Sequence, residues 1–295
     1  MRAALVIVAA ALLAACQGAV PAPESQERGP GLRVMTFNIR YGTAKDGENH
    51  WKHRKELVAD TIRESAPHVL AIQEGLGFQM DYLAEHCPGY LVLGQHRNGG
   101  RDGEFSGLLI NAAHLEVVDW GQFWLSSTPE VVASRGWDAA LARTAVWARL
   151  HERGAGAADF IVLGTHFDHR GVRAREESAR LVVEIMSKLR HGEEGTTGKP
   201  LSVILMGDFN ARPGTTPMSV FEQAGYVNAV PFMHPEATDG GTFHRFEGYH
   251  TGGMIDSIWV TRGWQPMEAE ILRPRLDGRS ASDHDPVFAL LPWAS

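Results

Sequence analysis

The chain has 295 residues, with 28 lysines and arginines against 35 aspartates and glutamates, so its formal net charge is −7. This acidic balance argues against a broad basic face for sequence-independent duplex binding, although it leaves room for a local basic groove. Only two cysteines are present, Cys16 and Cys87, and Cys16 directly follows an apolar N-terminal run typical of lipidation, so no disulfide framework is expected.

The N-terminus has the pattern of an exported lipoprotein. Arg2 supplies a positive charge, and residues 3–15 are an unbroken run of small and apolar side chains. The run is shorter than the roughly 20 residues of a membrane-spanning helix, and it fits a signal peptide over residues 1–15. It leads into Leu13-Ala14-Ala15-Cys16, which resembles the bacterial lipobox, where the Cys is acylated; ordinary signal cleavage is the alternative. The next residue is Gln17 rather than Asp, which by the usual sorting rule indicates the outer membrane, facing the periplasm or the surface.

A linker and one domain account for the rest of the chain. Residues 16–31 are read as a lipidated N-terminus and a flexible linker, because Gln17 to Gly31 is rich in Pro, Gly and polar residues. Residues 32–295 are enough for one large domain, and no second linker or internal repeat interrupts them. We expect this domain to be a monomer.

Strand-like and helix-like segments alternate along the domain. Leu32 to Ile39 alternates as a strand, Trp51 to Glu64 has helical spacing before Pro67, and Val172 to Arg190 carries the clearest helical stripe. Further apolar runs predict strands at residues 69–72, 107–110, 144–150, 160–165, 201–206, 255–260 and 286–291. Strands outnumber helices, and such apolar runs need cover on both faces. The pattern therefore predicts an α/β protein with layered sheets between helices.

Polar side chains stand where these apolar strands begin or end. Any one of them has an ordinary structural explanation, since Asp and Asn are common turn residues. Six such positions in one domain are harder to explain separately, because buried carboxylates are costly unless they are paired or bound to a cation. We therefore expect them to converge on one site; they are Asn38, Glu74, His166 with Asp168, Asp208 with Asn210, Asp256, and Asp283 with His284.

These residue types suit the attack of water on a phosphate ester. Asn38, Glu74 and Asp283 offer only oxygen ligands, which favour a hard cation such as Mg²⁺ or Mn²⁺. Asp208 can orient or deprotonate water, beside the Asn210 amide. His284 can donate to a phosphoryl oxygen, and Asp256 can hold its tautomer.

Six short motifs occur in a recognisable order, namely MTFNIR, IQE, GTHFD, GDFN, IDSIWV and SDHDPV. As a set they resemble the endonuclease/exonuclease/phosphatase superfamily, the deoxyribonuclease I-like metallophosphoesterases, and the resemblance covers nearly all of residues 32–291. It implies a four-layer α/β sandwich of two mixed sheets packed face to face with flanking helices. It also implies a divalent-metal-dependent hydrolase of phosphoesters that acts by in-line attack of activated water.

The resemblance assigns roles residue by residue. Glu74 becomes the principal metal ligand, assisted by Asn38 and Asp283. Asp208 aligns or deprotonates the water, and Asn210 holds a phosphate oxygen. His166 and His284 contact the phosphate, with His284 oriented by Asp256. Asp168, His169 and Asp285 lie beside the motifs and receive no role.

The segment from Trp120 to Thr144 is rich in Trp, Phe and Arg. One interpretation makes Arg135 or Arg143 a phosphate contact and the tryptophans part of a substrate wall. The other is core aromatics with a surface loop. Arg143 is the better candidate for a substrate contact, because it directly precedes a predicted strand.

A zinc-dependent hydrolase and a non-catalytic binding lipoprotein are the two alternative functions. Gly164-Thr-His-Phe-Asp-His resembles the zinc motif of metallo-β-lactamase-type hydrolases, but that motif needs another His at position 164. A surface-anchored binding lipoprotein without catalysis should have lost at least one costly motif residue, and none is missing.

The substrate is the open point within the enzyme class. Nucleic acid, a lipid headgroup and a small phosphoester all fit the composition. A diester, as for a phosphodiesterase or nuclease, is preferred over a monoester. The absence of a clear lipid-inserting hairpin weakens a sphingomyelinase assignment, and Met254 and Ser257 around Asp256 depart from the inositol-phosphatase consensus.

Overall fold

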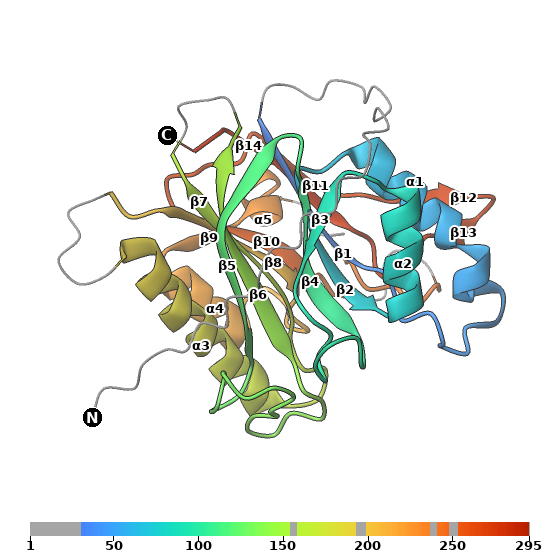
Figure 1. Ribbon diagram of the computed structural model, residues 1–295, viewed down its shortest axis with the longest axis horizontal. Coiled ribbons are helices and arrows are strands. Elements are labelled where there is room, and N and C mark those ends of the chain that lie inside the picture. Colours follow the sequence, from blue (N-terminus) through green and yellow to red (C-terminus); the bar gives the residue numbers. More distant parts are fainter. Residues whose placement is uncertain (1–30, 154–157, 193–198, 237–240, 248–252, 295) are drawn as a thin grey trace.

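Two six-stranded sheets pack face to face at the centre of the computed structural model, with helices on their outer sides (Figure 1). The structure describes residues 31–153, 158–192, 199–236, 241–247 and 253–294. The predicted signal peptide, Cys16 and all but the last residue of the predicted linker lie outside the described residues. Within the described part, no helix is long and apolar enough to cross a membrane.

Each sheet is mixed, with one parallel pair of strands. In the first sheet the order is β11 (Glu268–Ile271), β14 (Val287–Leu291), β1 (Leu32–Asn38), β2 (Val69–Gly75), β4 (Phe105–Asn111) and β3 (Tyr90–Leu93), and β1 runs parallel to β2. In the second it is β5 (Leu115–Trp124), β6 (Thr144–Glu152), β7 (Phe160–His166), β8 (Ser202–Asp208), β10 (Asp256–Thr261) and β9 (Tyr226–Asn228), and β7 runs parallel to β8. A separate ribbon pairs β12 (Arg275–Leu276) with β13 (Arg279–Ser280).

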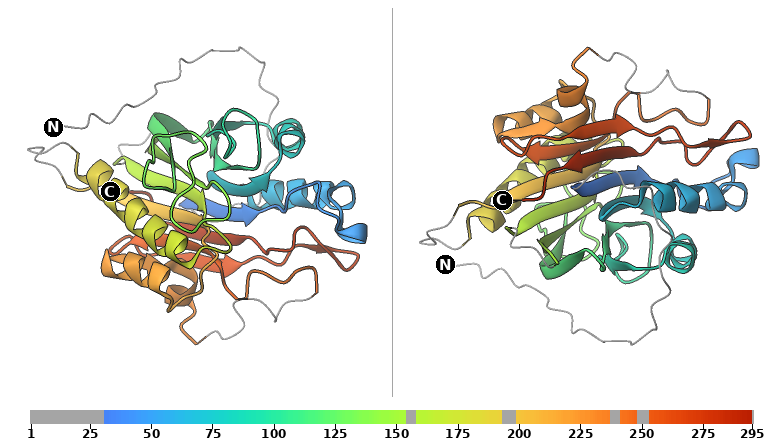
Figure 2. Two further views of the ribbon diagram at one scale, coloured as in Figure 1. Left: turned by 90° about the horizontal axis from the view of Figure 1, so that it is seen from below. Right: turned by 90° about the horizontal axis from the view of Figure 1, so that it is seen from above.

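Three layers of apolar side chains hold the sheets and helices together. The central layer lies between the sheets and includes Val34 and Val162. Helices α1 (Lys55–Ser65) and α2 (Gly77–His86) cover the first sheet, where Met35 and Phe37 face them. Helices α3 (Val172–His191) and α4 (Thr216–Gln223) cover the second, and short α5 (Ala229–Met233) follows β9 (Figure 2). The predicted four-layer sandwich is confirmed, and so is the alternation of the first strand.

The helix predicted from Trp51 begins later than expected. Two short 3₁₀ turns (Gly47–Asn49 and Trp51–His53) come first, and α1 starts at Lys55. The reason is Arg54, whose buried guanidinium donates to the carbonyls of Asn49, Ile39, Arg40 and Ala281. With its φ at −127°, Arg54 cannot continue a helix, so the spacing of apolar residues alone placed the start too early.

A buried histidine at the start of β2 should make the fold sensitive to acid. His68 Nδ1 accepts from the Arg33 amide at 3.1 Å, and its ring stacks on Trp293. Burial, with Arg33 and His114, lowers the pKa of His68 to about 3. Below its ordinary pKa of about 6.5 the unfolded chain binds a proton that the folded chain does not, so stability falls as pH falls from there toward 3.

We expect the free energy of unfolding to decrease by about 2 kcal/mol between pH 6.5 and 5 through His68 alone. His68→Asn, which keeps the acceptor for Arg33, should flatten urea-unfolding stability against pH by that amount. His191→Asn, at an exposed position on α3, is the control and should leave the profile unchanged. An equally steep profile in His68→Asn would contradict the expectation.

Candidate active site

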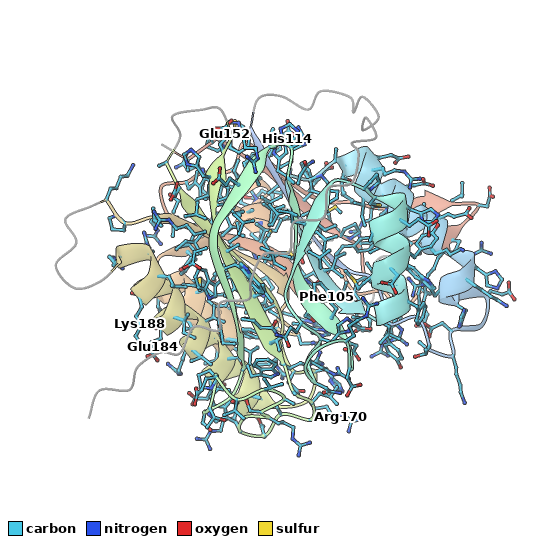
Figure 3. All side chains as sticks on the ribbon, viewed as in Figure 1. Phe105, His114, Glu152, Arg170, Glu184 and Lys188 are labelled. Atoms are coloured by element: carbon cyan, nitrogen blue, oxygen red, sulfur yellow. The ribbon has the colours of Figure 1, made fainter. Side chains whose placement is uncertain are left out.

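Strand ends from both sheets bring the polar residues together. His166 on β7 aligns with Asp208 on β8, and Asp208 aligns with Asp256 on the antiparallel β10. Asn38 ends β1 beside the end of β2, where Glu74 lies. In Figure 3 the residues labelled at the opposite end of the sheets are His114 and Glu152, whereas Arg170, just after β7, lies at the site's end.

Asp256 and His284 form a hydrogen-bonded pair. His284 Nδ1 lies 2.8 Å from Asp256 Oδ2, and both side chains are buried. The same carboxylate oxygen accepts from the Thr242 hydroxyl at 2.7 Å, and that hydroxyl in turn accepts from the amides of Ile255 and Asp256. Asp256 is thus held rigidly, and its bond to Nδ1 leaves His284 Nε2 as the ring atom available for a substrate. The predicted pairing of these two residues is present.

Asp208 occupies the middle of the site. Its oxygens accept from Asn38 Nδ2 at 3.0 Å and from the backbone amide of Asn210 at 2.9 Å. His166 Nε2 lies 3.5 Å away. Gly207 lets the strand reach this point, because a Cβ there would lie 2.2 Å from the Thr165 carbonyl oxygen. The glycine in GDFN is therefore a packing requirement of the parallel β7–β8 pair.

Glu74 and Asp283 supply two more carboxylates. Glu74 lies within a bulge of β2, between Ile72 and Gly75, with its φ at 64°, and its side chain accepts from Asn38 Nδ2 at 3.2 Å and from the Tyr41 backbone amide at 3.0 Å. Asp283 lies 3.5 Å from the Arg40 guanidinium. A left-handed Glu is strained, and such strain is often found at functional sites.

The charges of the site are unbalanced. Burial, followed by the charge of Asp256, raises the pKa of Asp208 to about 7. Burial also raises the pKa of Asp283, with Glu74 adding to the effect. Burial disfavours the charged form of His284, but Asp256 and the other nearby carboxylates outweigh it and hold its pKa well above the ordinary value. Burial and Arg143 hold the pKa of His166 well below that value, so this ring is neutral.

A divalent cation fits this arrangement. Four carboxylates share one region, and the pKa values of Asp208 and Asp283 are raised first by burial and then by a neighbouring carboxylate, Asp256 for Asp208 and Glu74 for Asp283. Among the described residues, the Oδ1 atom of Asp256 is buried without a hydrogen-bond partner. Hard oxygen ligands of this kind suit Mg²⁺ or Mn²⁺. Two sets could hold the ion: the predicted Asn38, Glu74 and Asp283, or the buried group of Asp208, Asp256 and His284, whose ligand atoms lie within 4.8 Å of one another.

Some candidates from the sequence have structural partners. Asp168 accepts from the backbone amides of Leu141, Arg170 and Gly171, so it ties the segment before β6 to the β7–α3 turn. Asn210 Nδ2 donates to the Phe167 carbonyl. The roles predicted for Asn210, His166 and the metal ligands stay predictions.

The aromatic segment turns out to be largely core. Trp124 is buried and donates to the Arg97 carbonyl, and Trp120 packs against the layer between the sheets. Arg135 is exposed and donates to a nearby carbonyl. The guanidinium of Arg143 is buried and lies 3.7 Å from the Asp168 carboxylate and 3.9 Å from the Glu104 carboxylate. A substrate would have to reach this buried group for the predicted contact to form.

Three positioning residues were assigned no role from the sequence, although Arg40 ends the motif MTFNIR. Thr242 fixes Asp256, Arg40 pairs with Asp283, and Arg54 ties the β1 loop to Ala281. Thr242 and Arg40 lie in irregular segments, where periodicity carries no information, and Arg54 lies between a 3₁₀ turn and α1, where the helical spacing was misleading. Gly164, where a zinc motif would need His, lies between the sheets; a Cβ there would be 2.9 Å from Leu108 Cδ2.

The fold and the site define a metal-dependent phosphoester hydrolase. Residues 35–284 match the model of the endonuclease/exonuclease/phosphatase family, and the chain belongs to that family. A comparison with curated proteins returned no match.

Solved structures of the same fold come from several sources. An endonuclease/exonuclease/phosphatase from Bacteroides vulgatus is 30% identical with a TM-score of 0.79, covering 90% of this chain and 100% of that one. The mannosyl-6-phosphatase Bt3783 of Bacteroides thetaiotaomicron is 29% identical with a TM-score of 0.77, covering 88% and 99%. The human Nocturnin catalytic domain, at 18% identity, a TM-score of 0.71 and coverage of 90% and 94%, shares the fold.

Proposed function

We propose that this chain is a Mg²⁺- or Mn²⁺-dependent phosphodiesterase or nuclease that acts by in-line attack of water. The observation that carries the proposal is the buried Asp256–His284 pair beside Asp208. Asn38, Glu74 and Asp283 would hold the ion, which when bound neutralises charge on the phosphoryl group.

The remaining residues have separate roles around the phosphoryl group. Asp208, held by Asn38 and the Asn210 amide, orients the attacking water and accepts its proton. His284 Nε2, oriented through Asp256, donates to a non-bridging phosphoryl oxygen. Neutral His166, whose Nδ1 is buried without a partner among the described residues, contacts the phosphate together with His284.

The balance of charge favours a diester over a monoester. Glu74, Asp208, Asp256, Asp283 and the Arg40 partner Asp46 carry five formal negative charges, and Arg40, Arg54 and protonated His284 carry three positive ones. A divalent ion brings the sum to zero. A centre without surplus positive charge accommodates the single charge of a diester better than the double charge of a monoester.

A phosphomonoesterase is the second candidate. It is favoured by the similarity to a mannosyl-6-phosphatase along nearly the whole of both chains. A phospholipid-headgroup phosphodiesterase is a further option on the same fold, and a non-catalytic binding lipoprotein is the option of another class.

A substrate panel tests the proposal. With Mg²⁺ and with Mn²⁺, we expect kcat/KM for bis-p-nitrophenyl phosphate to exceed that for p-nitrophenyl phosphate about tenfold. DNA, RNA, sphingomyelin, inositol phosphates and mannose 6-phosphate complete the panel, with the strongly impaired variant Glu74→Ala as the control. The reverse order would favour the monoesterase, and no hydrolysis with any metal would favour the binding lipoprotein.

We also propose that the chain is exported and lipid-anchored through Cys16 in a bacterial outer membrane, as a monomer. The position of Leu32 supports this proposal. β1 begins at Leu32 and ends at Asn38 in the site, so the chain enters the domain at the end opposite the catalytic residues. An anchor on this side would leave the active site facing away from the membrane.

A further inference from the structure

The segment 241–247 is held against the catalytic residues by alternate side chains. Thr242 bonds Asp256 and its carbonyl accepts from the Asp285 amide. His244 is buried, and its backbone amide donates to the Asp283 carbonyl at 2.9 Å. The loop is therefore anchored by Thr242, which bonds Asp256 and Asp285, and by His244, which bonds Asp283.

The intervening residues are the more accessible ones. Phe243 is half-buried, and its ring centre lies 4.7 Å from that of His284. Arg245 is exposed, and its guanidinium carbon lies 5.3 Å from the centre of the Phe243 ring. The two distances together place this cation within about 10 Å of the catalytic imidazole.

Arg245 holds this position at a conformational cost. Its φ is 54°, and Phe246 follows at 61°, in the left-handed region that favours glycine. Such residues persist only where the surroundings compensate, and they cluster at functional sites. Among the described residues no carboxylate pairs with the Arg245 guanidinium, so the cost is not explained by an ion pair.

We propose that Arg245, supported by Phe243, binds a second anionic group of the substrate, such as a further phosphate near the scissile one. This inference rests on the proposed function, since it concerns the same site. With the metal bound, the centre has no surplus positive charge. The exposed guanidinium of Arg245 nearby supplies one positive charge, which can pair with one additional negative charge on the substrate. Arg245 is thus a specificity-determining residue, and charge-assisted hydrogen bonds to phosphate are strong enough to matter.

Two matched ligand pairs test the assignment. The first is the p-nitrophenyl ester of thymidine 5′-phosphate, with and without a 3′-phosphate, assayed for kcat and KM in Mg²⁺. The second is thymidine 3′,5′-bisphosphate against thymidine 5′-phosphate, measured by calorimetry. We expect the wild-type protein to prefer the member with the second phosphate about tenfold, through KM and Kd rather than kcat.

Arg245→Gly should abolish that preference while the melting temperature stays level or rises, because glycine relieves the strained φ. Arg245→Lys should keep most of the preference. Arg262→Gln, exposed beyond the far end of β10, should behave as wild type. Equal wild-type affinity for both members of a pair, a preference that survives Arg245→Gly, or an equal loss in Arg262→Gln would overturn the inference. If neither ester is hydrolysed, the proposed function fails, and calorimetry still decides the role of Arg245.

Discussion

Asp208→Asn should lower kcat about 10³-fold without unfolding the protein. General-base residues contribute about 10²- to 10⁴-fold, and Asp208 is the carboxylate held between Asn38, the Asn210 amide and His166. The amide keeps the size of the side chain but cannot accept a proton from water. KM should change little, because the substrate's contacts come from other residues.

Stability should move in the opposite direction from activity. The fold raises the pKa of Asp208 to about 7, mainly by burial, so the folded chain binds this proton more tightly than the unfolded chain does. Ionised Asp208 therefore costs stability as pH rises from about 4 to 7, and Asn removes that cost. Without added metal, the melting temperature of the variant should equal or exceed that of wild type at pH 8, with a smaller difference at pH 5.

The matched control is Asp159→Asn, which lies beside the opposite end of β7 and pairs with Arg149. Its kcat should equal that of wild type. A lower melting temperature in Asp208→Asn at pH 8, with kcat within tenfold of wild type, would mean that Asp208 is a structural carboxylate.

The sequence predicts the sheets well because their strands are buried on both faces. Runs such as FIVLGTH and LSVILMGD have apolar residues in both the central layer and the layer under α3, and this is what the continuous hydrophobic pattern indicated. The hydrophobic pattern did not predict α2 or the edge strand β3, where Leu91 and Val92 are exposed and the pattern is weak. Edge elements carry less burial and so less signal.

The site was predictable where residues end regular strands, and not where they sit in loops. Asn38, His166 and Asp208 lie at strand termini, so their direction follows from the strand. Thr242 reaches Asp256 across fourteen residues through an irregular segment, and no periodicity specifies that contact. Such loop residues become visible only when tertiary packing is known.

Glu74→Ala should raise the Mg²⁺ concentration for half-maximal activity at least about tenfold and lower kcat/KM about 10²- to 10³-fold. Losing a residue that only supports a metal ligand already costs about 10- to 100-fold, so losing a principal ligand should cost no less. Glu85→Ala, at an exposed position on α2, is the control and should leave both values unchanged.

Direct metal binding separates the two possible ligand sets. Asp256 Oδ2 and His284 Nδ1 are engaged with each other at 2.8 Å, so while this hydrogen bond is kept the pair offers a metal only Asp256 Oδ1 and His284 Nε2. Mn²⁺ binding, followed by electron paramagnetic resonance, should therefore weaken in Glu74→Ala and persist in Asp256→Asn. The opposite result would move the ion to Asp208, Asp256 and His284, and Glu74 would then act on the substrate or on Asn38 instead, because the Asn38 amide joins Glu74 to Asp208.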